Sequence, residues 1–322
     1  MATALGTSGR GAVGYAVLFP GQGSQFVGMG ADIFESRPDL VGDSADLAVG
    51  FSLRDTCLNG PAEELTKTEH AQPALFALSY ALWDELSARV PPPAASAGHS
   101  LGEYTALVAA GVIGYWDALT VVAERGRAMA AAAEIEESGM AALIGIDADG
   151  AEQLCATRRH AGGRLWVANL NAPGQVVVAG AAEDLEWLSG NGRDLGVRRV
   201  IPLEVAGAFH SPLMEPAAER VARALAAIDP APPRFPVYAN VSAIPVRAGE
   251  VKAVLASQMV SAVRFSETLQ SMAAAGIHTF VHVGPGDVTA GLVKRTVGDA
   301  RVVVVSSRAG VSAAVDTLGT IA

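Results

Sequence analysis

The residues with the clearest chemical potential form the run Gly98-His-Ser-Leu-Gly-Glu-Tyr104. Its Gly98-x-Ser100-x-Gly102 spacing is typical of a nucleophile elbow, a sharp turn between a strand and a helix that exposes the central serine. Both glycines are needed because a side chain at either place would collide with neighbouring backbone. The following helix directs its partial positive charge at the serine, where an oxyanion would develop. The pattern therefore predicts a nucleophile at Ser100 and, taken alone, suggests hydrolysis.

A serine nucleophile needs a base, and the sequence contains six histidines. His210 lies in Gly207-Ala-Phe-His-Ser-Pro-Leu-Met214, where a loop before a helix can face a cleft, and it is the preferred candidate. His99 adjoins Ser100, so we expect its side chain to point away from the serine. The other histidines lie on helical or strand patterns and are interpreted as structural: His70, His160, His278 and His282.

A glycine in the middle of a predicted helix is a further signal. Gly126 lies between Arg125 and Arg127, and glycine there costs about 1 kcal/mol relative to alanine. This position therefore indicates a close approach of another group to the helix. The two arginines are open to two interpretations, a solvated helix face or a functional role.

The loop Pro20-Gly-Gln-Gly-Ser-Gln25 follows a predicted strand at 15–19. It is not a dinucleotide-binding fingerprint, because Phe26 occupies the place of the third glycine. The loop is either an ordinary strand-to-helix turn or a set of backbone N–H groups that face Ser100.

Strands alternate with helices through most of the chain, which predicts an α/β sheet. Pro73 is predicted at the first turn of a helix that runs to about Ala88. The other expected helices are 103–112, 116–133, 213–228, 251–259 and 289–297, and the other expected strands are 94–97, 236–238, 279–283 and 302–306.

Residues 140–204 have a different pattern, with strands at 140–146, 164–170, 175–179 and 197–203 and helices at 150–160 and 182–195. This βαββαβ order predicts a ferredoxin-like unit inserted in the α/β body. A cleft between the two units is the natural binding site. The expected division is a flexible tail at 1–14, a catalytic domain at 15–138 and 206–310, a small domain at 139–205 and a C-terminal segment at 311–322.

Bulk composition limits the functional classes. The 322 residues carry a net charge of −10, which argues against a nucleic-acid or anionic-membrane surface. No apolar run reaches the roughly 18 residues of a membrane span, and the first 14 residues lack the apolar stretch of a secretory signal. Cys57 and Cys155 fit no metal spacing and indicate a reducing compartment. We expect a cytoplasmic protein.

Several segments together resemble the malonyl-CoA:acyl carrier protein transacylases and the related acyltransferase domains of polyketide synthases. They occur in the family's order from about residue 15 to 300: Phe19-Pro-Gly-Gln-Gly-Ser-Gln25, Gly60-Pro-Ala-Glu-Glu-Leu65, Gln72-Pro-Ala74, Gly98-His-Ser-Leu-Gly-Glu-Tyr104, Arg125-Gly126, Asn171-Ala-Pro-Gly-Gln175, His210 and Gly284-Pro-Gly286. The resemblance implies an α/β-hydrolase-like large domain with a ferredoxin-like insertion.

The resemblance also implies a mechanism. Ser100 would attack the thioester of malonyl-CoA with His210 as base, and the phosphopantetheine thiol of acyl carrier protein would then take the acyl group. No cofactor is needed, because phosphopantetheine is carried by the partner. The remaining roles transfer by position: oxyanion-hole N–H groups at Gln22 and Leu101, a malonyl-carboxylate receptor at Arg125, a carbonyl at Gln258 that orients His210, and supporting residues at His99, Gln72 and Asn171.

Two features qualify the resemblance. Phe209, before the histidine, goes with malonyl rather than methylmalonyl in polyketide acyltransferases, although many stand-alone transacylases have serine there. Ser261-Ala-Val-Arg-Phe265 stands where the family commonly has Asn-Pro-Val-x-Trp, so a backbone constraint is missing after Gln258.

An acidic carrier protein requires a basic docking surface on the enzyme. Its candidates are Lys294, Arg295, Arg193, Arg198 and Arg199, each of which could equally be a solvated charge. We expect a monomer that serves fatty acid synthesis. The alternatives are a stand-alone malonyl acyltransferase of a polyketide assembly line, a serine thioesterase or esterase, and a non-catalytic binding protein.

Overall fold

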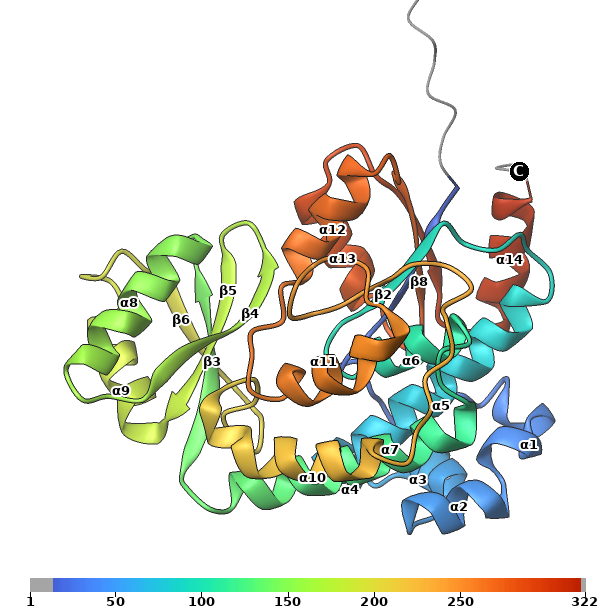
Figure 1. The fold of residues 1–322 in the computed structure, drawn as a ribbon, viewed down its shortest axis with the longest axis horizontal. Helices are drawn as coiled ribbons and strands as arrows, with labels where there is room; N and C mark the ends of the chain where they lie inside the picture. The colour runs from blue at the N-terminus through green and yellow to red at the C-terminus, as the bar shows by residue number, and fades with distance from the viewer. Residues whose placement is uncertain (1–13, 320–322) are drawn as a thin grey trace, which may run out of the picture.

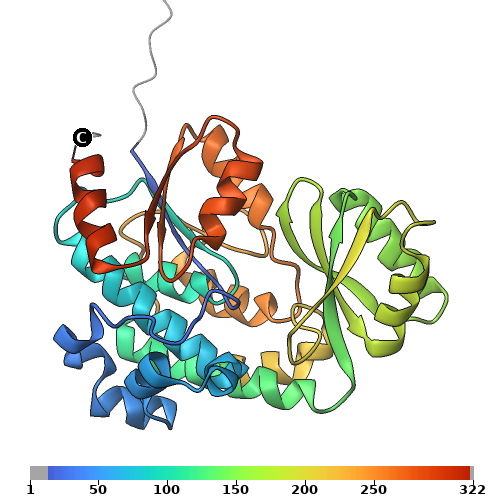
Figure 2. The same ribbon diagram turned by 180° about the vertical axis from the view of Figure 1, so that it is seen from behind.

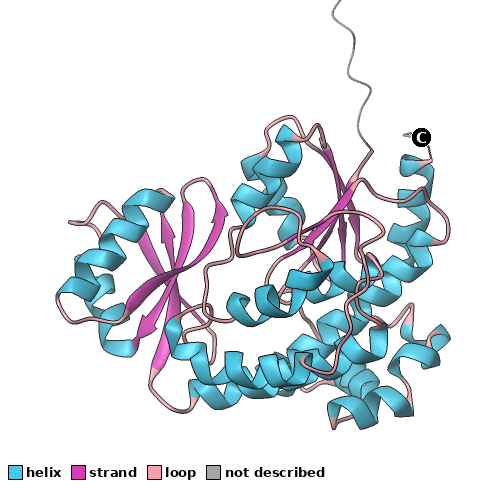
Figure 3. Cartoon of the chain, in the orientation of Figure 1, coloured by secondary structure: helices cyan, strands magenta, loops and turns pink. Residues whose placement is uncertain are grey.

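The computed structural model describes residues 14–319 and contains two β-sheets, each with its own helices (Figures 1 and 3). Except for Gly14, the predicted tail 1–14 lies outside the described residues, as do the last three residues of the predicted C-terminal segment.

The larger sheet is parallel and has five strands in the order β7-β2-β1-β8-β9. Its strands are β1 (Ala16–Phe19), β2 (Ala95–Gly98), β7 (Val237–Tyr238), β8 (Thr279–Val283) and β9 (Arg301–Val305). Because all pairings are parallel, the loops after β1, β2 and β7 leave the same edge of the sheet, side by side.

Helices cover both faces of this sheet, as the two ribbon views show (Figures 1 and 2). Val17 and Phe19 of β1 pack in the cluster that includes the helices between β1 and β3, while Ala16 and Leu18 pack on the other face with residues of α12 and α13. This alternation along β1 follows from the two-residue period of a strand that is buried on both faces. The main helices are α5 (Thr68–Ser87), α6 (Gly102–Ala109), α7 (Tyr115–Ala133), α10 (Glu215–Leu225), α11 (Val251–Gln258), α12 (Phe265–Ala274), α13 (Val288–Thr296) and α14 (Arg308–Leu318).

The smaller sheet is antiparallel with the order β4-β5-β3-β6. Its elements follow the predicted βαββαβ order: β3 (Ser138–Ile144), α8 (Ala148–His160), β4 (Leu165–Ala172), β5 (Gln175–Ala181), α9 (Ala182–Asn191) and β6 (Arg199–Leu203). One face packs on α8 and α9 in a separate hydrophobic cluster of residues such as Leu143, Leu154 and Val178. The predicted α/β fold with a ferredoxin-like insertion is confirmed.

The small sheet is tied to the larger unit through β4. The Leu170 N–H donates to the Val263 carbonyl and the Val263 N–H to the Ala168 carbonyl, both at 2.8 Å. Val263 and Phe265 of this connecting segment are fully buried. The segment that lacks the family's proline is therefore held by backbone pairing to β4 instead.

The position of Pro73 differs from the prediction. It lies inside α5, which begins five residues earlier at Thr68. Proline cannot donate the usual helical bond to the Glu69 carbonyl, so a helix start was the simpler expectation. However, α5 packs closely on α7, and this tertiary contact supports the turn that precedes the proline.

Several helices were not predicted. Four of them, in the stretch between β1 and α5, are short: α1 (Pro38–Val41), α2 (Asp43–Val49), α3 (Leu53–Asn59) and α4 (Ala62–Thr66). Such lengths give too few turns for a hydrophobic period to emerge. Helices α12 and α14 were missed as well.

No helix within residues 14–319 is both long and apolar enough to cross a membrane.

Candidate active site

The nucleophile elbow joins β2 to α6. A Cβ atom at Gly98 would lie 1.8 Å from the backbone carbon of Gly102, and one at Gly102 would lie 2.3 Å from the Phe19 carbonyl oxygen. The predicted need for both glycines is thus confirmed. Ser100 itself adopts φ 50°, a left-handed conformation that costs a non-glycine residue about 1–3 kcal/mol. The surrounding bonds must compensate for that strain.

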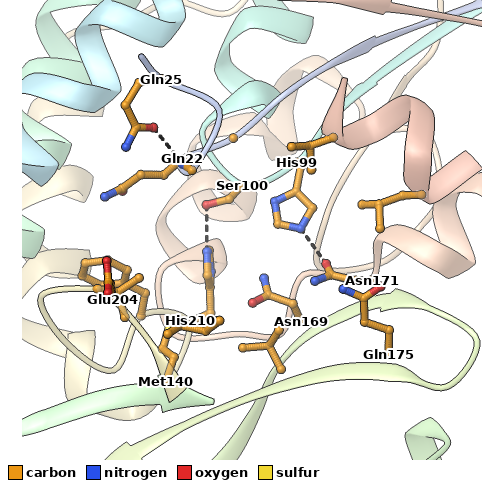
Figure 4. A pocket seen from close by; sticks show the side chains of 18 of the residues that line it. Gln22, Gln25, His99, Ser100, Met140, Asn169, Asn171, Gln175, Glu204 and His210 are labelled. Carbon is orange, nitrogen blue, oxygen red and sulfur yellow. Dashed lines mark hydrogen bonds between the residues drawn. The ribbon is translucent and has the colours of Figure 1, made fainter. Parts of the chain in front are cut away.

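His210 lies opposite the elbow, in the loop that returns from the small sheet (Figure 4). Its Nε2 lies 2.7 Å from Ser100 Oγ, and its Nδ1 lies 2.8 Å from the Gln258 carbonyl oxygen. Because a carbonyl only accepts, Nδ1 carries the proton and Nε2 is free to accept from the serine hydroxyl. Burial, and then the charge of Arg125, lower the pKa of His210 to about 3, so its ring is neutral at physiological pH. The structure brings these predicted residues into one chain of contacts.

The loop after β1 runs directly beside the elbow. A Cβ atom at Gly21 would lie 2.5 Å from the His99 carbonyl oxygen, so only glycine permits this approach. The backbone N–H groups of Gln22 and Leu101 donate to no other group within residues 14–319. The Gln22 side chain is held by a 3.1 Å bond to Thr68 Oγ1 at the start of α5.

Arg125 of α7 lies behind Ser100 with an exposed fraction of 1%. Its Nη2 donates to Ser100 Oγ at 2.9 Å and to Gln258 Oε1 at 3.0 Å, and its Nη1 donates to Gln72 Oε1 at 2.5 Å. Burial lowers the pKa of this guanidinium from its ordinary value. The structure thus places a buried cation on the serine oxygen.

The next residue, Gly126, explains how α7 comes so close to α5. A Cβ atom there would lie 2.7 Å from the Glu69 Cα and 3.0 Å from the Thr68 carbonyl oxygen. The predicted close approach is confirmed, and the approaching group is the helix backbone.

Four other predicted residues lie around this centre. His99 Nε2 is 2.7 Å from Asn171 Oδ1, which turns the imidazole toward β4 and away from His210 (Figure 4). Gln72 Nε2 contacts Met129 Sδ at 3.3 Å. Phe209 is 5% exposed and faces the cavity.

A cavity of about 400 Å³ opens in front of Ser100 and His210. Its wall comes from the β1 loop, the elbow, the small sheet and α13, so it lies between the two units as expected. The lining residues are Gly21, Gln22, Gly23, Gln25, Thr66, His99, Ser100, Met129, Met140, Asn169, Asn171, Gln175, Val177, Leu203, Glu204, Val205, Phe209, His210, Val288, Leu292 and Arg295. His70, His160, His278 and His282 are not among them.

Sequence reasoning missed two polar residues of the site, Glu103 and Asn240. Asn240 follows β7 and accepts from the Ser100 N–H at 2.7 Å through Oδ1. Glu103, in the first turn of α6, is fully buried and accepts from Gln258 Nε2 at 2.7 Å through Oε2. The sequence signal for Asn240 was a polar residue soon after a predicted strand. The signal for Glu103 was an acidic residue within the elbow motif itself.

The predicted docking residues lie in two places. Lys294 and Arg295 are exposed in the last turn of α13, where Arg295 also lines the cavity mouth. Arg193, Arg198 and Arg199 lie together around a separate hollow of the small domain. Among the described residues, no group of three or more His, Cys, Asp or Glu side chains is placed to hold a metal ion.

A serine at the carboxyl edge of a parallel sheet, paired with a histidine across a cleft that an inserted antiparallel sheet helps to wall, defines an α/β enzyme with a serine nucleophile and a histidine base. The acyl transferase domain family matches residues 17–314. A malonyl CoA-acyl carrier protein transacylase of Bacillus subtilis (strain 168) is 42% identical over 306 residues, which cover 94% of this chain and 96% of the relative.

Solved structures agree. The malonyl CoA-acyl carrier protein transacylase of Coxiella burnetii superposes with a TM-score of 0.90 at 32% identity, covering 96% of this chain and 98% of its own. A malonyl-transacylase in complex with a type II polyketide synthase acyl-carrier protein superposes with a TM-score of 0.89 at 36% identity, covering 94% and 99%. The chain belongs to the malonyl-CoA:acyl carrier protein transacylase family.

Proposed function

We propose that Ser100 carries a malonyl group from malonyl-CoA to the phosphopantetheine thiol of an acyl carrier protein. The observation that carries this proposal is the chain of contacts from the Gln258 carbonyl through His210 to Ser100 Oγ, with Arg125 on the same oxygen. The serine–histidine pair supplies acyl transfer, and the buried cation supplies a reason to select an acyl group that carries its own carboxylate.

In the first half-reaction, His210 Nε2 removes the Ser100 hydroxyl proton as Oγ attacks the thioester carbonyl carbon. The carbonyl oxygen becomes an oxyanion, for which the free N–H groups of Gln22 and Leu101 are the donors. When the intermediate collapses, the carbon–sulfur bond breaks and His210 returns the proton to the sulfur of coenzyme A. Malonyl-serine remains.

The second half-reaction reverses these steps with a different thiol. The phosphopantetheine sulfur gives its proton to His210 as it attacks the ester carbon, and the carbon–oxygen bond to Ser100 breaks. His210 then protonates Oγ. The Gln258 carbonyl keeps Nδ1 protonated throughout, so the same ring nitrogen serves as base and acid in turn.

Arg125 is the proposed receptor of the malonyl carboxylate. Guanidinium presents two parallel N–H groups to a planar carboxylate, which an ammonium group cannot do. In the structure Nη2 already donates to Ser100 Oγ, so the cation lies where the acyl group would be attached. A charge-assisted bond of this kind contributes about 1.5–3 kcal/mol.

Intact-mass measurement tests the proposal. Wild-type protein incubated with malonyl-CoA should gain about 86 Da, the malonyl increment expected for a serine ester, and lose it when holo acyl carrier protein is added. Ser100→Ala should gain nothing. Release of malonate at a rate independent of the carrier thiol would instead indicate a thioesterase.

We further propose fatty acid synthesis as the pathway, with a polyketide assembly line as the second candidate. The likeness to a malonyl-transacylase complexed with a polyketide acyl-carrier protein and the aromatic Phe209 support the second. Comparing the rates of malonyl transfer to a fatty-acid and a polyketide carrier protein distinguishes them.

The same proposal covers the partner surface and setting. Exposed Lys294 and Arg295 beside the cavity mouth support docking of an acidic carrier protein there. The free, buried thiols of Cys57 and Cys155 support a reducing, cytoplasmic setting. The separate hydrophobic cluster of the small sheet supports the division at 139–205.

A further inference from the structure

A polar cluster lies behind the catalytic pair, on the side away from the cavity. It contains Glu103, Asn240 and the Gln258 side chain, all of which are fully buried, and none of the three lines the cavity. Burying a carboxylate and two amides costs free energy unless their hydrogen bonds are made. The arrangement of these bonds shows what the cluster holds.

The Gln258 side chain bridges a cation and a carboxylate. Its Oε1 accepts from Arg125 Nη2 at 3.0 Å, while its Nε2 donates to Glu103 Oε2 at 2.7 Å and to the Ser100 carbonyl at 3.0 Å. The opposite charges at its two ends allow only one orientation of the amide. Because the backbone carbonyl of the same residue holds His210 Nδ1, fixing this side chain also fixes the base.

Asn240 holds the elbow from the other side. Its Oδ1 accepts from the Ser100 N–H and its Nδ2 donates to the Gly98 carbonyl, both at 2.7 Å. Both bonds hold the backbone on the N-terminal side of the strained serine, while the Gln258 bond to the Ser100 carbonyl holds its C-terminal side. The Asn240 backbone N–H in turn donates to Glu103 Oε2 at 3.1 Å.

The same carboxylate oxygen, Glu103 Oε2, therefore accepts hydrogen bonds from Gln258, which holds the base, and from Asn240, which holds the elbow. We propose that Glu103 is a positioning residue for acyl transfer, whose carboxylate holds Gln258 and Asn240 and, through them, the His210 base and the Ser100 elbow. This inference rests on the proposed function of Ser100.

The electrostatics agree with this role. Burial is the largest influence on Glu103 and raises its pKa to about 7. The hydrogen bonds from Gln258 and the Asn240 N–H, and then the charge of Arg125 across the Gln258 amide, act in the opposite direction and favour the ionised form. Either protonation state keeps Oε2 as an acceptor, so holding the two amides does not require the negative charge.

The test uses Glu103→Ala and Glu103→Gln in the full chain. Glu103→Ala removes the shared acceptor, so we expect kcat for malonyl transfer to fall about 10²-fold, the effect of a misplacement near 1 Å, with KM for malonyl-CoA changed little. Glu103→Gln can still present an oxygen to both donors and should restore kcat to within about threefold of wild type. Each kcat is calculated per folded enzyme molecule, and the concentration of folded enzyme is measured by titrating its reactive serine.

A double-mutant cycle shows whether Glu103 acts through Gln258. Gln258→Ala removes the bridging amide but keeps the backbone carbonyl, so adding Glu103→Ala should lower kcat by much less than the roughly 10²-fold it costs alone, because only the bond to the Asn240 N–H remains to be lost. Asp184→Asn is the matched control, because Asp184 is a fully buried carboxylate that accepts from Arg158 Nε at 2.5 Å and the Arg164 N–H at 2.6 Å, away from the cavity. It should lower the melting temperature while leaving kcat per folded enzyme unchanged.

If the wild type forms malonyl-serine, two results would overturn the inference about Glu103 while leaving the proposed function intact. One is an unchanged kcat per folded molecule in Glu103→Ala. The other is full additivity of Glu103→Ala with Gln258→Ala. A wild type that forms no malonyl adduct would overturn the proposed function, and this inference with it.

Discussion

Arg125 Nη2 donates to Ser100 Oγ at 2.9 Å, so the buried cation touches the nucleophile itself. The same nitrogen also donates to Gln258 Oε1, and Nη1 donates to Gln72 Oε1. The guanidinium is thus held at a fixed place by two neutral amides, with no carboxylate hydrogen-bonded to it among the described residues. Glu103 faces the guanidinium only across the Gln258 amide, so a substrate carboxylate would be the one to bond to it directly.

Replacing Arg125 by alanine should therefore change acyl selectivity. We expect Arg125→Ala to lower kcat/KM for malonyl transfer by about 10- to 100-fold, as loss of one charge-assisted bond predicts, and to make acetyl transfer relatively better. Paired assays with malonyl-CoA and acetyl-CoA measure the ratio. Arg127→Ala is the control, because Arg127 bonds to the Val49 carbonyl at 3.1 Å on another face of α7. An unchanged malonyl preference in Arg125→Ala would remove the carboxylate-receptor role.

The sequence predicts those parts of the site that depend on local geometry. The spacing of Gly98, Ser100 and Gly102 predicts the elbow because the collision that a side chain would cause is with backbone only a few residues away. The period of strands and helices likewise predicts the two sheets. Gly126 is detectable because glycine is unfavourable in the middle of a helix, whatever lies beside it.

The rest of the site depends on contacts between distant residues. Asn240 bonds to the Ser100 N–H across 140 positions and its N–H bonds to Glu103 across 137, so no local pattern reports either role. Pro73 was misplaced for a related reason. The packing of α7 on the first turn of α5 extends the helix beyond what local propensity favours.

Gly126→Ala tests the contact between the two helices. Alanine should gain about 1 kcal/mol of helix propensity, but its Cβ would lie 2.7 Å from the Glu69 Cα and force the helices apart. We expect a net loss of about 1–2 kcal/mol in the free energy of unfolding. Gly190→Ala in α9, where a Cβ meets nothing within 4 Å, should leave stability unchanged or raise it. Urea denaturation compares the two, and equal stabilities would contradict the close-packing account.

The pH dependence of malonyl loading should reflect the buried base. Because the pKa of His210 is lowered to about 3 by burial and by Arg125, the ring stays neutral and kcat/KM should show no acid limb near pH 6.5. In Arg125→Ala the acid limb of the profile should move to higher pH, because removing a nearby positive charge raises the pKa of His210. Rapid-quench measurements of malonyl-serine between pH 5 and 8 give the profile.

That profile needs one control, because Glu103 also titrates, with a pKa raised to about 7. Measuring Glu103→Gln in parallel removes its contribution. A wild-type midpoint near 6.5 that persists in this variant would contradict a desolvated His210. The lowered pKa of His210 also affects stability. Below pH 6.5 the unfolded chain binds a proton that the folded His210 ring does not, so the free energy of unfolding decreases as the pH falls from 6.5 toward 3.

The basic end of α13 should matter for the carrier protein and little for coenzyme A. Lys294 and Arg295 are exposed in the last turn of this helix, and Arg295 reaches the cavity mouth. Reversing both to glutamate should raise KM for acyl carrier protein about tenfold through like-charge repulsion, while the rate of malonyl loading stays within about twofold.

Arg223→Glu provides a matched charge reversal, because Arg223 is 70% exposed on α10 and does not line the cavity. Lys294→Glu alone separates docking from effects at the mouth, since Lys294 is not a lining residue. The raised KM should diminish as salt increases, because screening shortens the range of the repulsion. Equal losses in loading and in transfer would mean that these side chains serve the cavity rather than a docking surface.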